Sequence, residues 1–249
     1  MDLFRFDNLS QVPGVVHAIS TRSGGISQGR CESLNVSYSV GDTHENVDEN
    51  IRRLSTAVGS RVEDLFSAYQ VHGREVTLVE PATQPRPRCD VLATSSAART
   101  LMLRYADCTP VLLADPHRRV VAAVHAGWRG SALRAAGAAV EALRETYGSR
   151  PEDIVAGIGP AIGPCCYVIG QDVVDAFGDR PELLSRDQDG MKLDLWQANH
   201  VALVEAGVRA EQIELAGVCT QCEAERFFSH RANKGQPAGR FAALIRLEA

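Results

Sequence analysis

Apolar residues recur at helical spacing in two long segments of the chain, and a glycine closes each of them. Val47, Ile51 and Leu54 fall on one face of the first segment, which Gly59 ends. The second segment repeats the pattern and stops at Gly148. The helices that we predict from this spacing are 44–58, 131–147, 171–177 and 194–206.

Short apolar runs bounded by turn residues predict many strands between these helices. The predicted strands are 15–20, 65–70, 75–79, 91–94, 100–105, 111–114, 120–125, 154–158, 213–217 and 240–247. Residues 111–114 and 120–124 lack polar alternation, which is typical of strands buried on both faces of a covered sheet. Because several steps lead directly from strand to strand, the pattern favours a mixed-sheet α/β or α+β sandwich over a strictly alternating doubly wound fold.

Composition and charge narrow the classes of partner. The chain has 249 residues, 45% hydrophobic and 23% charged, which is ordinary for a globular protein. Its net charge is −5 and no block of Lys and Arg stands out, so we expect neither nucleic acid nor an anionic membrane as the main partner. Segment 81–88 contains three prolines, and we interpret it as a surface loop, not as a linker between domains.

The N-terminal residues and the cysteines predict a cytoplasmic protein. No basic region followed by a long apolar run opens the chain, and no apolar stretch is long enough to span a bilayer. Seven cysteines is an odd number in a chain too long to need disulfide staples, which favours free thiols in a reducing compartment.

Three potential metal ligands, His72, Cys108 and His125, each follow an apolar run and are flanked by small or turn residues. Two imidazoles and a thiolate suit a zinc site that keeps one position open for water or substrate. Their wide separation differs from the close Cys pairs of structural zinc, so the spacing indicates an active site. The same atoms can instead form a Cys/His nucleophile pair, and the residues alone leave both chemistries open.

Zinc chemistry suggests a hydrolytic task for such a site. Zinc lowers the pKa of bound water toward neutrality, and a first shell of two His and one Cys is close in kind to that of nucleobase deaminases. Asp107 precedes Cys108. It can orient a ligand or act as a general base, or it can simply cap a turn.

Two arginines are candidates for binding an anion. Residues 127–130 lead into the helix predicted from 131, where backbone N–H groups favour an anion and Arg129 can grip a phosphate. Arg22, before Ser23-Gly24-Gly25, is a second candidate of lower rank.

The remaining motifs have weaker interpretations. Two prolines in 157–164 remove donors that a phosphate loop needs, so we expect a rigid wall of a cleft there. Cys219 and Cys222 have Cys-x-x-Cys spacing but lack a second such pair, and adjacent Cys165 and Cys166 are not expected to be a ligand pair. His230 can line the cleft. The other histidines, His17, His44, His117 and His200, are expected to be surface or packing residues.

Motifs along nearly the whole chain resemble the YfiH/laccase-domain family, whose members are also known as multicopper polyphenol oxidase-like proteins and as peptidoglycan-editing factors. The motifs that carry the resemblance are 21–25, 33–35, 41–42, 70–73, 106–110, 125–130, 158–163, 219–220, 227–229 and 239–240. The stretches around Cys108 and His125 are the most specific of them.

The resemblance implies a layered α/β/β/α mixed-sheet sandwich, similar to YfiH-like cysteine hydrolases, formed as a single domain by residues 1–249. It implies zinc at His72, Cys108 and His125, and purine-nucleoside chemistry: phosphorolysis of adenosine, inosine and methylthioadenosine, and deamination of adenosine. The small-molecule partners would be a nucleoside and phosphate. We assign catalysis to Cys108, His125, His72 and Asp107, and substrate or phosphate binding to Arg129, Arg22 and Asn35.

Two other functions stay open at this stage. A His₂Cys set can hold copper, which would allow a laccase-like oxidation of phenols, although seven scattered histidines are too few for a multicopper centre. A cysteine hydrolase or amidase that edits peptidoglycan precursors would use Cys108 as nucleophile and His125 or His72 as base. A non-enzymatic binding module is least favoured, because it does not need three soft ligands at strand ends. The sequence sets no oligomeric state.

Overall fold

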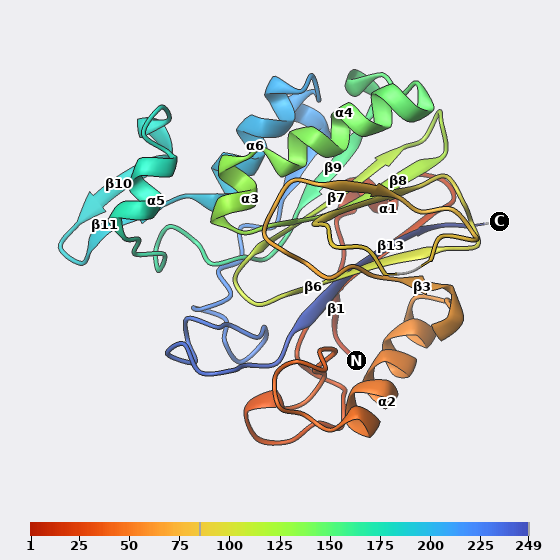
Figure 1. Cartoon of the computed structure of the whole chain (residues 1–249), viewed down its shortest axis with the longest axis horizontal. Helices are drawn as coiled ribbons and strands as arrows, with labels where there is room; N and C mark the ends of the chain where they lie inside the picture. Colours follow the sequence, from red (N-terminus) through yellow and green to blue (C-terminus); the bar gives the residue numbers. More distant parts are fainter. Residues whose placement is uncertain (85, 249) are drawn as a thin grey trace.

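The computed structural model describes residues 1–84 and 86–248 and consists of two β-sheets packed face to face, with helices on both outer surfaces (Figure 1). One sheet has five strands in the order β1-β2-β13-β6-β3, and the other has six in the order β12-β9-β7-β8-β5-β4. Both sheets mix parallel and antiparallel pairs. The predicted α/β/β/α sandwich is confirmed.

The elements have the following bounds. The five-stranded sheet contains β1 (Leu3–Phe4), β2 (Val15–Ser20), β3 (Leu65–Phe66), β6 (Thr100–Tyr105) and β13 (Phe241–Leu247). The six-stranded sheet contains β4 (Val76–Leu78), β5 (Val91–Thr94), β7 (Thr109–Asp115), β8 (Val120–Ala126), β9 (Val155–Ile158) and β12 (Ile213–Leu215). A separate hairpin is formed by β10 (Leu184–Asp187) and β11 (Gly190–Leu193). The α-helices are α1 (Asp7–Ser10), α2 (His44–Ala57), α3 (Trp128–Ala132), α4 (Ala135–Tyr147), α5 (Gln171–Ala176) and α6 (Leu195–Glu205). Single 3-10 turns lie at Gly29–Cys31, Val62–Asp64, Pro151–Asp153, Pro181–Leu183 and Ala210–Gln212.

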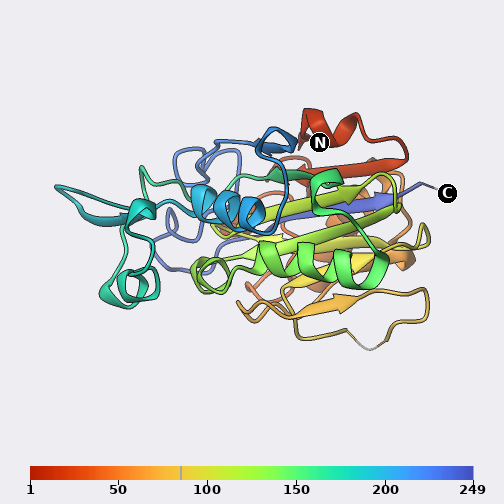
Figure 2. The ribbon, with the colours of Figure 1, turned by 90° about the horizontal axis from the view of Figure 1, so that it is seen from above.

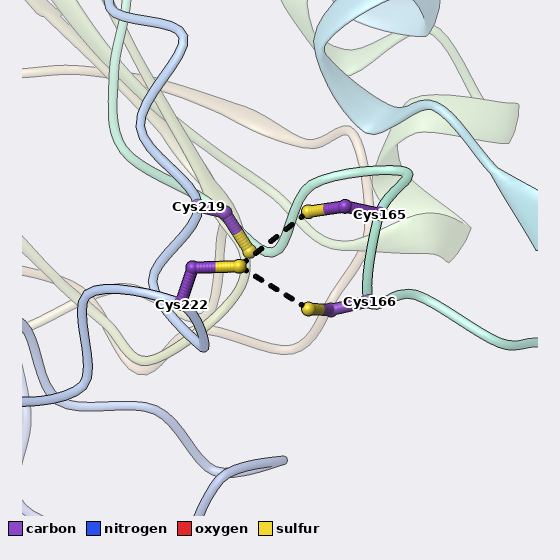
Figure 3. A group of neighbouring side chains, drawn as sticks. All are labelled: Cys165, Cys166, Cys219 and Cys222. Carbon is purple, nitrogen blue, oxygen red and sulfur yellow. Dashed lines mark hydrogen bonds between the residues drawn. The ribbon is translucent and has the colours of Figure 1, made fainter.

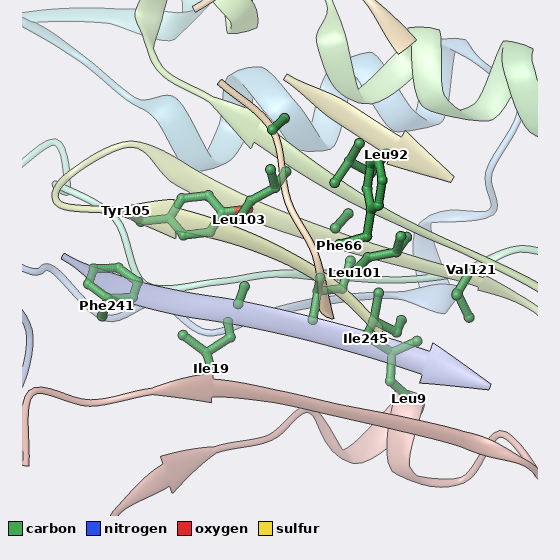
Figure 4. Packing of buried hydrophobic residues seen from close by; sticks show 14 of the residues in the cluster. Leu9, Ile19, Phe66, Leu92, Leu101, Leu103, Tyr105, Val121, Phe241 and Ile245 are labelled. Carbon is green, nitrogen blue, oxygen red and sulfur yellow. The ribbon is translucent and has the colours of Figure 1, made fainter. Parts of the chain in front are cut away.

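Apolar side chains fill the space between the two sheets (Figure 4). Ile19 and Leu101 come from the five-stranded sheet and Leu92 from the six-stranded one. A second buried cluster lies between the six-stranded sheet and helices α4 and α6, and a third lies under α2. Successive residues of β7 therefore pack against different layers: Leu112 faces the other sheet, while Leu113 faces the helices. This explains why β7 and β8 lack polar alternation, as predicted.

The structure corrects two of the predicted elements. The expected helix over 131–147 is two helices, because Arg134 adopts the left-handed conformation (φ 58°) and separates α3 from α4. The expected strand over 65–70 is reduced to β3, the two-residue edge strand of its sheet. Residue 85 of the predicted loop 81–88 lies outside the described residues.

The β10–β11 hairpin was not predicted, whereas the neighbouring helix α5 falls within the predicted helix 171–177. They project from one end of the two sheets (cyan in Figures 1 and 2). The residues of β10 are mostly exposed, so this strand carries no alternating apolar signal. Within the described residues, no helix is long and apolar enough to cross a membrane.

Candidate active site

The three predicted ligands meet at one end of β7 and β8, the two central strands of the six-stranded sheet. As the sequence predicted, they are His72, Cys108 and His125. One ligand atom from each residue lies within 4.8 Å of those of the other two. Cys108 lies in the short connection between β6 and β7, and His125 is the penultimate residue of β8. Because β7 and β8 pair antiparallel with Pro110 opposite His125, the sheet register places Cys108 beside that imidazole. His72 enters from the loop between β3 and β4.

Gly127 leaves the room that the three ligands need. A Cβ atom at this position would lie 2.9 Å from Cys108 Sγ and 3.1 Å from His72 Cδ2. Side chains do not tolerate the first of these separations, so a residue larger than glycine displaces the thiol or the imidazole. Gly127 is also the residue that caps α3, and it turns the chain away from the ligands directly after β8.

Two residues of the site hold unusual backbone conformations. His72 has φ 61° and Asp107 has φ 83°, in the region that L-residues rarely adopt. Such conformations cost on the order of 1–3 kcal/mol each and persist only where the surroundings enforce them. Their presence beside Cys108 is consistent with a site whose geometry is set for chemistry.

Asp90 holds one of the three ligands, and the backbone of another, in position. Its carboxylate is fully buried, and His125 Nδ1 lies 2.7 Å from its Oδ1. The same carboxylate accepts hydrogen bonds from the backbone N–H groups of Val71, His72 and Gly73. A proton on His125 Nδ1 leaves the other ring nitrogen free for a metal or for the thiol. We did not predict a role for this residue from the sequence, although an aspartate directly before a buried strand was a usable signal.

The charges of Cys108 and His125 support each other. Burial raises the pKa of the Cys108 thiol, but the charge and hydrogen bond of His125 and the hydrogen bond of His72 outweigh it and lower the pKa to about 6. Burial lowers the pKa of His125, but the Cys108 thiolate and Asp90 raise it to about 9. The pKa of Asp90 is lowered despite its burial, chiefly by the hydrogen bond from His125. The sulfur is therefore a thiolate at neutral pH, the form that binds metals and attacks electrophiles.

The three residues open into a cavity of about 1010 Å³ that is rich in arginine. The arginines that line it are Arg86, Arg88, Arg104, Arg129, Arg231 and Arg240. Asp107 is the only acidic residue among the described residues of the lining. This excess of positive charge favours an anionic ligand. Of the six arginines, the sequence predicted only Arg129, because the others come from separate loops and strands.

Arg129 and Arg104 illustrate two different roles within this lining. The half-buried Arg104 guanidinium donates to the carbonyl oxygen of Val36 and to the hydroxyl of Ser67, and its loss of hydration lowers its pKa to about 10. Arg129 is exposed and lies over the Trp128 ring at 4.1 Å, and no side chain or carbonyl of the described residues accepts a hydrogen bond from it. Arg104 is thus part of the scaffold, whereas Arg129 is free to bind a ligand.

Aromatic side chains form further parts of the lining. Tyr167 lies under the Arg231 guanidinium and Tyr69 under that of Arg86, at 5.3 and 4.3 Å from the ring centres. His230 also lines the cavity, which the sequence left open. Flat rings beside cationic groups suit a ligand with both a planar base and an anion.

Asp107 holds the neighbouring loops. Its Oδ1 accepts a hydrogen bond from the Thr220 hydroxyl and its Oδ2 accepts one from the backbone N–H of Arg231, both at 2.7 Å. Because both oxygens are engaged, this arrangement favours the turn-holding interpretation of Asp107 over that of a free general base.

The structure does not bring Arg22 and Asn35 into the cavity lining. Arg22 donates to two backbone carbonyl oxygens and covers the ring of Phe228. Asn35 is fully buried, and its Oδ1 accepts a hydrogen bond from the backbone N–H of Arg240. Asn35 therefore acts on the cavity through the position of Arg240. The predicted rigid wall is present in part, since Ile162 lines the cavity.

Comparisons with known proteins agree with this architecture. Residues 16–248 match the family described as multi-copper polyphenol oxidoreductase laccase. The purine nucleoside phosphorylase YlmD of Geobacillus stearothermophilus is 36% identical, over 93% of this chain and 90% of that protein. The purine nucleoside phosphorylase YfiH of Shigella flexneri is also 36% identical, over 93% of each chain. The crystal structure of the Geobacillus YlmD superimposes with a TM-score of 0.92 at 34% identity, over 100% of this chain and 97% of that one.

Proposed function

Because this chain belongs to the family described as multi-copper polyphenol oxidoreductase laccase, and relatives at 36% identity are named purine nucleoside phosphorylases, we propose that it is a zinc-dependent enzyme of that kind. The observation that carries the proposal is the placement of two imidazoles and a thiolate in a cavity lined by six arginines. The first feature suits zinc and the second suits phosphate.

The donor set fits zinc. Two histidine nitrogens and one thiolate make three protein ligands, which is the number found in catalytic zinc sites, and Gly127 keeps the space around them open. When bound, the ion supplies a Lewis acid with one position left for a group from solvent or substrate. Asp90 fixes the tautomer and direction of His125, and through the 71–73 backbone it fixes the place of His72.

Phosphorolysis of a nucleoside breaks the bond between C1′ and the base nitrogen and forms a bond from C1′ to a phosphate oxygen, while the base leaves with a proton. In this cavity we assign phosphate binding to Arg129 and Arg88, whose side chains are exposed. The rings of Tyr167 and Trp128 supply faces against which a purine can stack. We propose adenosine, inosine and methylthioadenosine as substrates, and deamination of adenosine as a second reaction at the same centre.

The test uses purified protein with its metal content measured. Each nucleoside is supplied with and without inorganic phosphate, and the products are separated as free base, sugar phosphate and deaminated nucleoside. We expect free base and sugar 1-phosphate only when phosphate is present, and no product from Cys108→Ala. Absence of base release from all three nucleosides, in protein that holds stoichiometric zinc, would sink the proposal.

Copper chemistry is the weaker alternative. Among the described residues, groups of three or more His, Cys, Asp or Glu that can hold a metal occur at two places, the His₂Cys set and a cluster of four cysteines. Neither offers the many histidines of a multicopper centre. Stoichiometric copper in native protein would favour phenol oxidation instead.

One further observation favours a second candidate function, that of a cysteine hydrolase. Cys108, His125 and Asp90 stand in the order nucleophile, base and orienting carboxylate. A peptidoglycan precursor peptide is the substrate class to test. Amide hydrolysis that survives removal of the metal, with an acyl group trapped on Cys108, would favour this function over the phosphorylase.

A further inference from the structure

Four cysteines far apart in sequence meet outside the active site. Cys165 and Cys166 lie in the loop that follows β9, and Cys219 and Cys222 in the loop that follows β12 (Figure 3). Their sulfur atoms all lie within 4.8 Å of one another. No sequence motif joins the two pairs, because only one has Cys-x-x-Cys spacing. Parallel pairing of β9 with β12 brings them together, since both loops leave the same end of adjacent strands.

The distances between the sulfur atoms suit a tetrahedral metal site. Cys166 Sγ lies 3.4 Å from Cys222 Sγ, and Cys165 Sγ lies 3.7 Å from it. Four sulfurs bonded at about 2.3 Å to one zinc ion stand about 3.8 Å apart. A disulfide needs about 2.05 Å and joins sulfurs only two at a time, so it does not account for four that converge. We propose that Cys165, Cys166, Cys219 and Cys222 bind one Zn²⁺ as a structural site.

A tight turn explains how adjacent cysteines serve one ion. The carbonyl oxygen of Gly163 accepts hydrogen bonds from the backbone N–H groups of Cys166 and Tyr167, at 3.0 and 2.9 Å. Figure 3 shows both side chains directed from this turn toward Cys219 and Cys222. A Cβ atom at Gly163 would lie 2.5 Å from the Trp196 ring, so glycine lets the turn approach the rest of the structure.

The surroundings compensate the negative charge of thiolates. Backbone N–H of Gly163 donates to Cys219 Sγ at 3.3 Å. Burial raises the pKa of Cys219, but hydrogen bonds from the backbone N–H groups of Cys222 and Gly163, from the Cys165 thiol and from the backbone N–H of Gln221 lower it by more. Lys192, a buried lysine, donates to the carbonyl oxygen of Cys165 at 3.0 Å. Its ammonium also pairs with Asp187 at 2.6 Å, so the donors to sulfur are what offsets the net charge of −2 that four thiolates and one Zn²⁺ carry.

The site joins two loops that form one wall of the active-site cavity. Backbone N–H of Ile162 donates to the carbonyl oxygen of Asp107, and the Thr220 hydroxyl donates to its carboxylate. Ile162 precedes Cys165 by three residues and Thr220 follows Cys219. Zinc bound to the cysteines would therefore hold in place the two loops that donate hydrogen bonds to Asp107. This role does not depend on which reaction the cavity performs.

The experiment counts metal per chain in full-length variants. Cys222→Ser and Cys166→Ser are each expected to lose one zinc ion relative to the wild type, while Cys31→Ser, a cysteine outside both clusters, loses none. Cys108→Ala removes a ligand of the active site, and X-ray absorption of its remaining zinc should show four sulfurs at about 2.3 Å. Unchanged zinc in Cys222→Ser, iron in place of zinc, or a disulfide within the cluster would overturn the proposal.

A second measurement uses the wild-type protein alone, so it does not depend on whether the variants fold. Cys165 and Cys222 are exposed, so free thiols there would react readily with a maleimide. In the wild-type protein we expect mass spectrometry of peptides to show both cysteines protected until a strong chelator is added. Equal rates of modification with and without chelator would contradict bound metal.

Discussion

His125 Nδ1 lies 2.7 Å from Oδ1 of Asp90, whose carboxylate has no exposed surface. The two oxygens of this carboxylate also accept hydrogen bonds from the backbone N–H groups of residues 71–73. One buried side chain thus sets the direction of one predicted metal ligand and the backbone position of another. Cys108 completes the group from the β6–β7 connection, so two of the three segments that meet here depend on a single carboxylate.

Replacement of Asp90 by Asn is expected to weaken zinc binding about 10- to 100-fold, the range found when a partner that orients a ligand is lost. The amide NH₂ group would face backbone N–H donors that now meet a carboxylate oxygen, so the 71–73 loop should also loosen. Competition with a chromophoric chelator measures the change in zinc affinity.

Asp115→Asn is the matched control for this effect. Asp115 is another buried aspartate whose carboxylate accepts backbone N–H groups, those of His117 and Arg118. It belongs to the far end of β7 from the metal ligands. We expect its loss to lower stability without changing zinc affinity. Equal losses of zinc affinity in the two variants would show that Asp90 acts only on general stability.

The limits of the sequence are visible in particular residues. His72, Cys108 and His125 could be predicted as a group because each follows an apolar run and the motifs around them are specific. The helix α2 could be predicted because its apolar face has a clear period. The place of Arg240 in the cavity and the convergence of Cys165 with Cys222 could not be predicted, because each depends on strand pairings that link distant segments.

Replacement of Arg129 by Ala is expected to raise the KM for phosphate about 10- to 150-fold with a smaller effect on kcat. A hydrogen bond to a charged group contributes about 1.5–3 kcal/mol, which corresponds to a change of that size. Initial rates at saturating nucleoside and varied phosphate give the two constants. Arg74→Ala serves as control, because Arg74 is exposed and pairs with Glu141 outside the cavity lining. An unchanged KM for phosphate in Arg129→Ala would move the phosphate site elsewhere.

Replacement of Gly127 by Ala is expected to reduce both zinc content and activity about tenfold or more. The added Cβ would come within 2.9 Å of Cys108 Sγ, and overpacking of this kind costs about 1–3 kcal/mol. Gly178→Ala is a fair comparison, since a Cβ there meets nothing closer than 3.5 Å. Zinc content is measured by mass spectrometry of digested protein. Full zinc content in Gly127→Ala would mean that the ligands move aside without cost.

His17 gives a prediction about stability that is independent of the active site. Its Nε2 accepts a hydrogen bond from the backbone N–H of Phe6 at 2.8 Å, and the imidazole is buried. Burial, with the charge of Arg5, lowers its pKa from 6.5 to about 4. The unfolded chain therefore binds a proton more readily than the folded one. The stability that His17 contributes is fully present above pH 6.5 and is lost as the pH falls from 6.5 to 4.

The size of this loss is about 3 kcal/mol, because each pKa unit corresponds to about 1.4 kcal/mol. His17→Gln keeps an acceptor for the Phe6 N–H but cannot be protonated, so its free energy of unfolding should fall less steeply with acid. Urea unfolding of both proteins at several pH values between 7.5 and 4.5 measures the difference, in which any pH dependence of metal binding cancels. His117→Gln changes an exposed histidine and should follow the wild-type curve. Parallel curves for wild type and His17→Gln would show that His17 binds its proton equally in the folded and unfolded states.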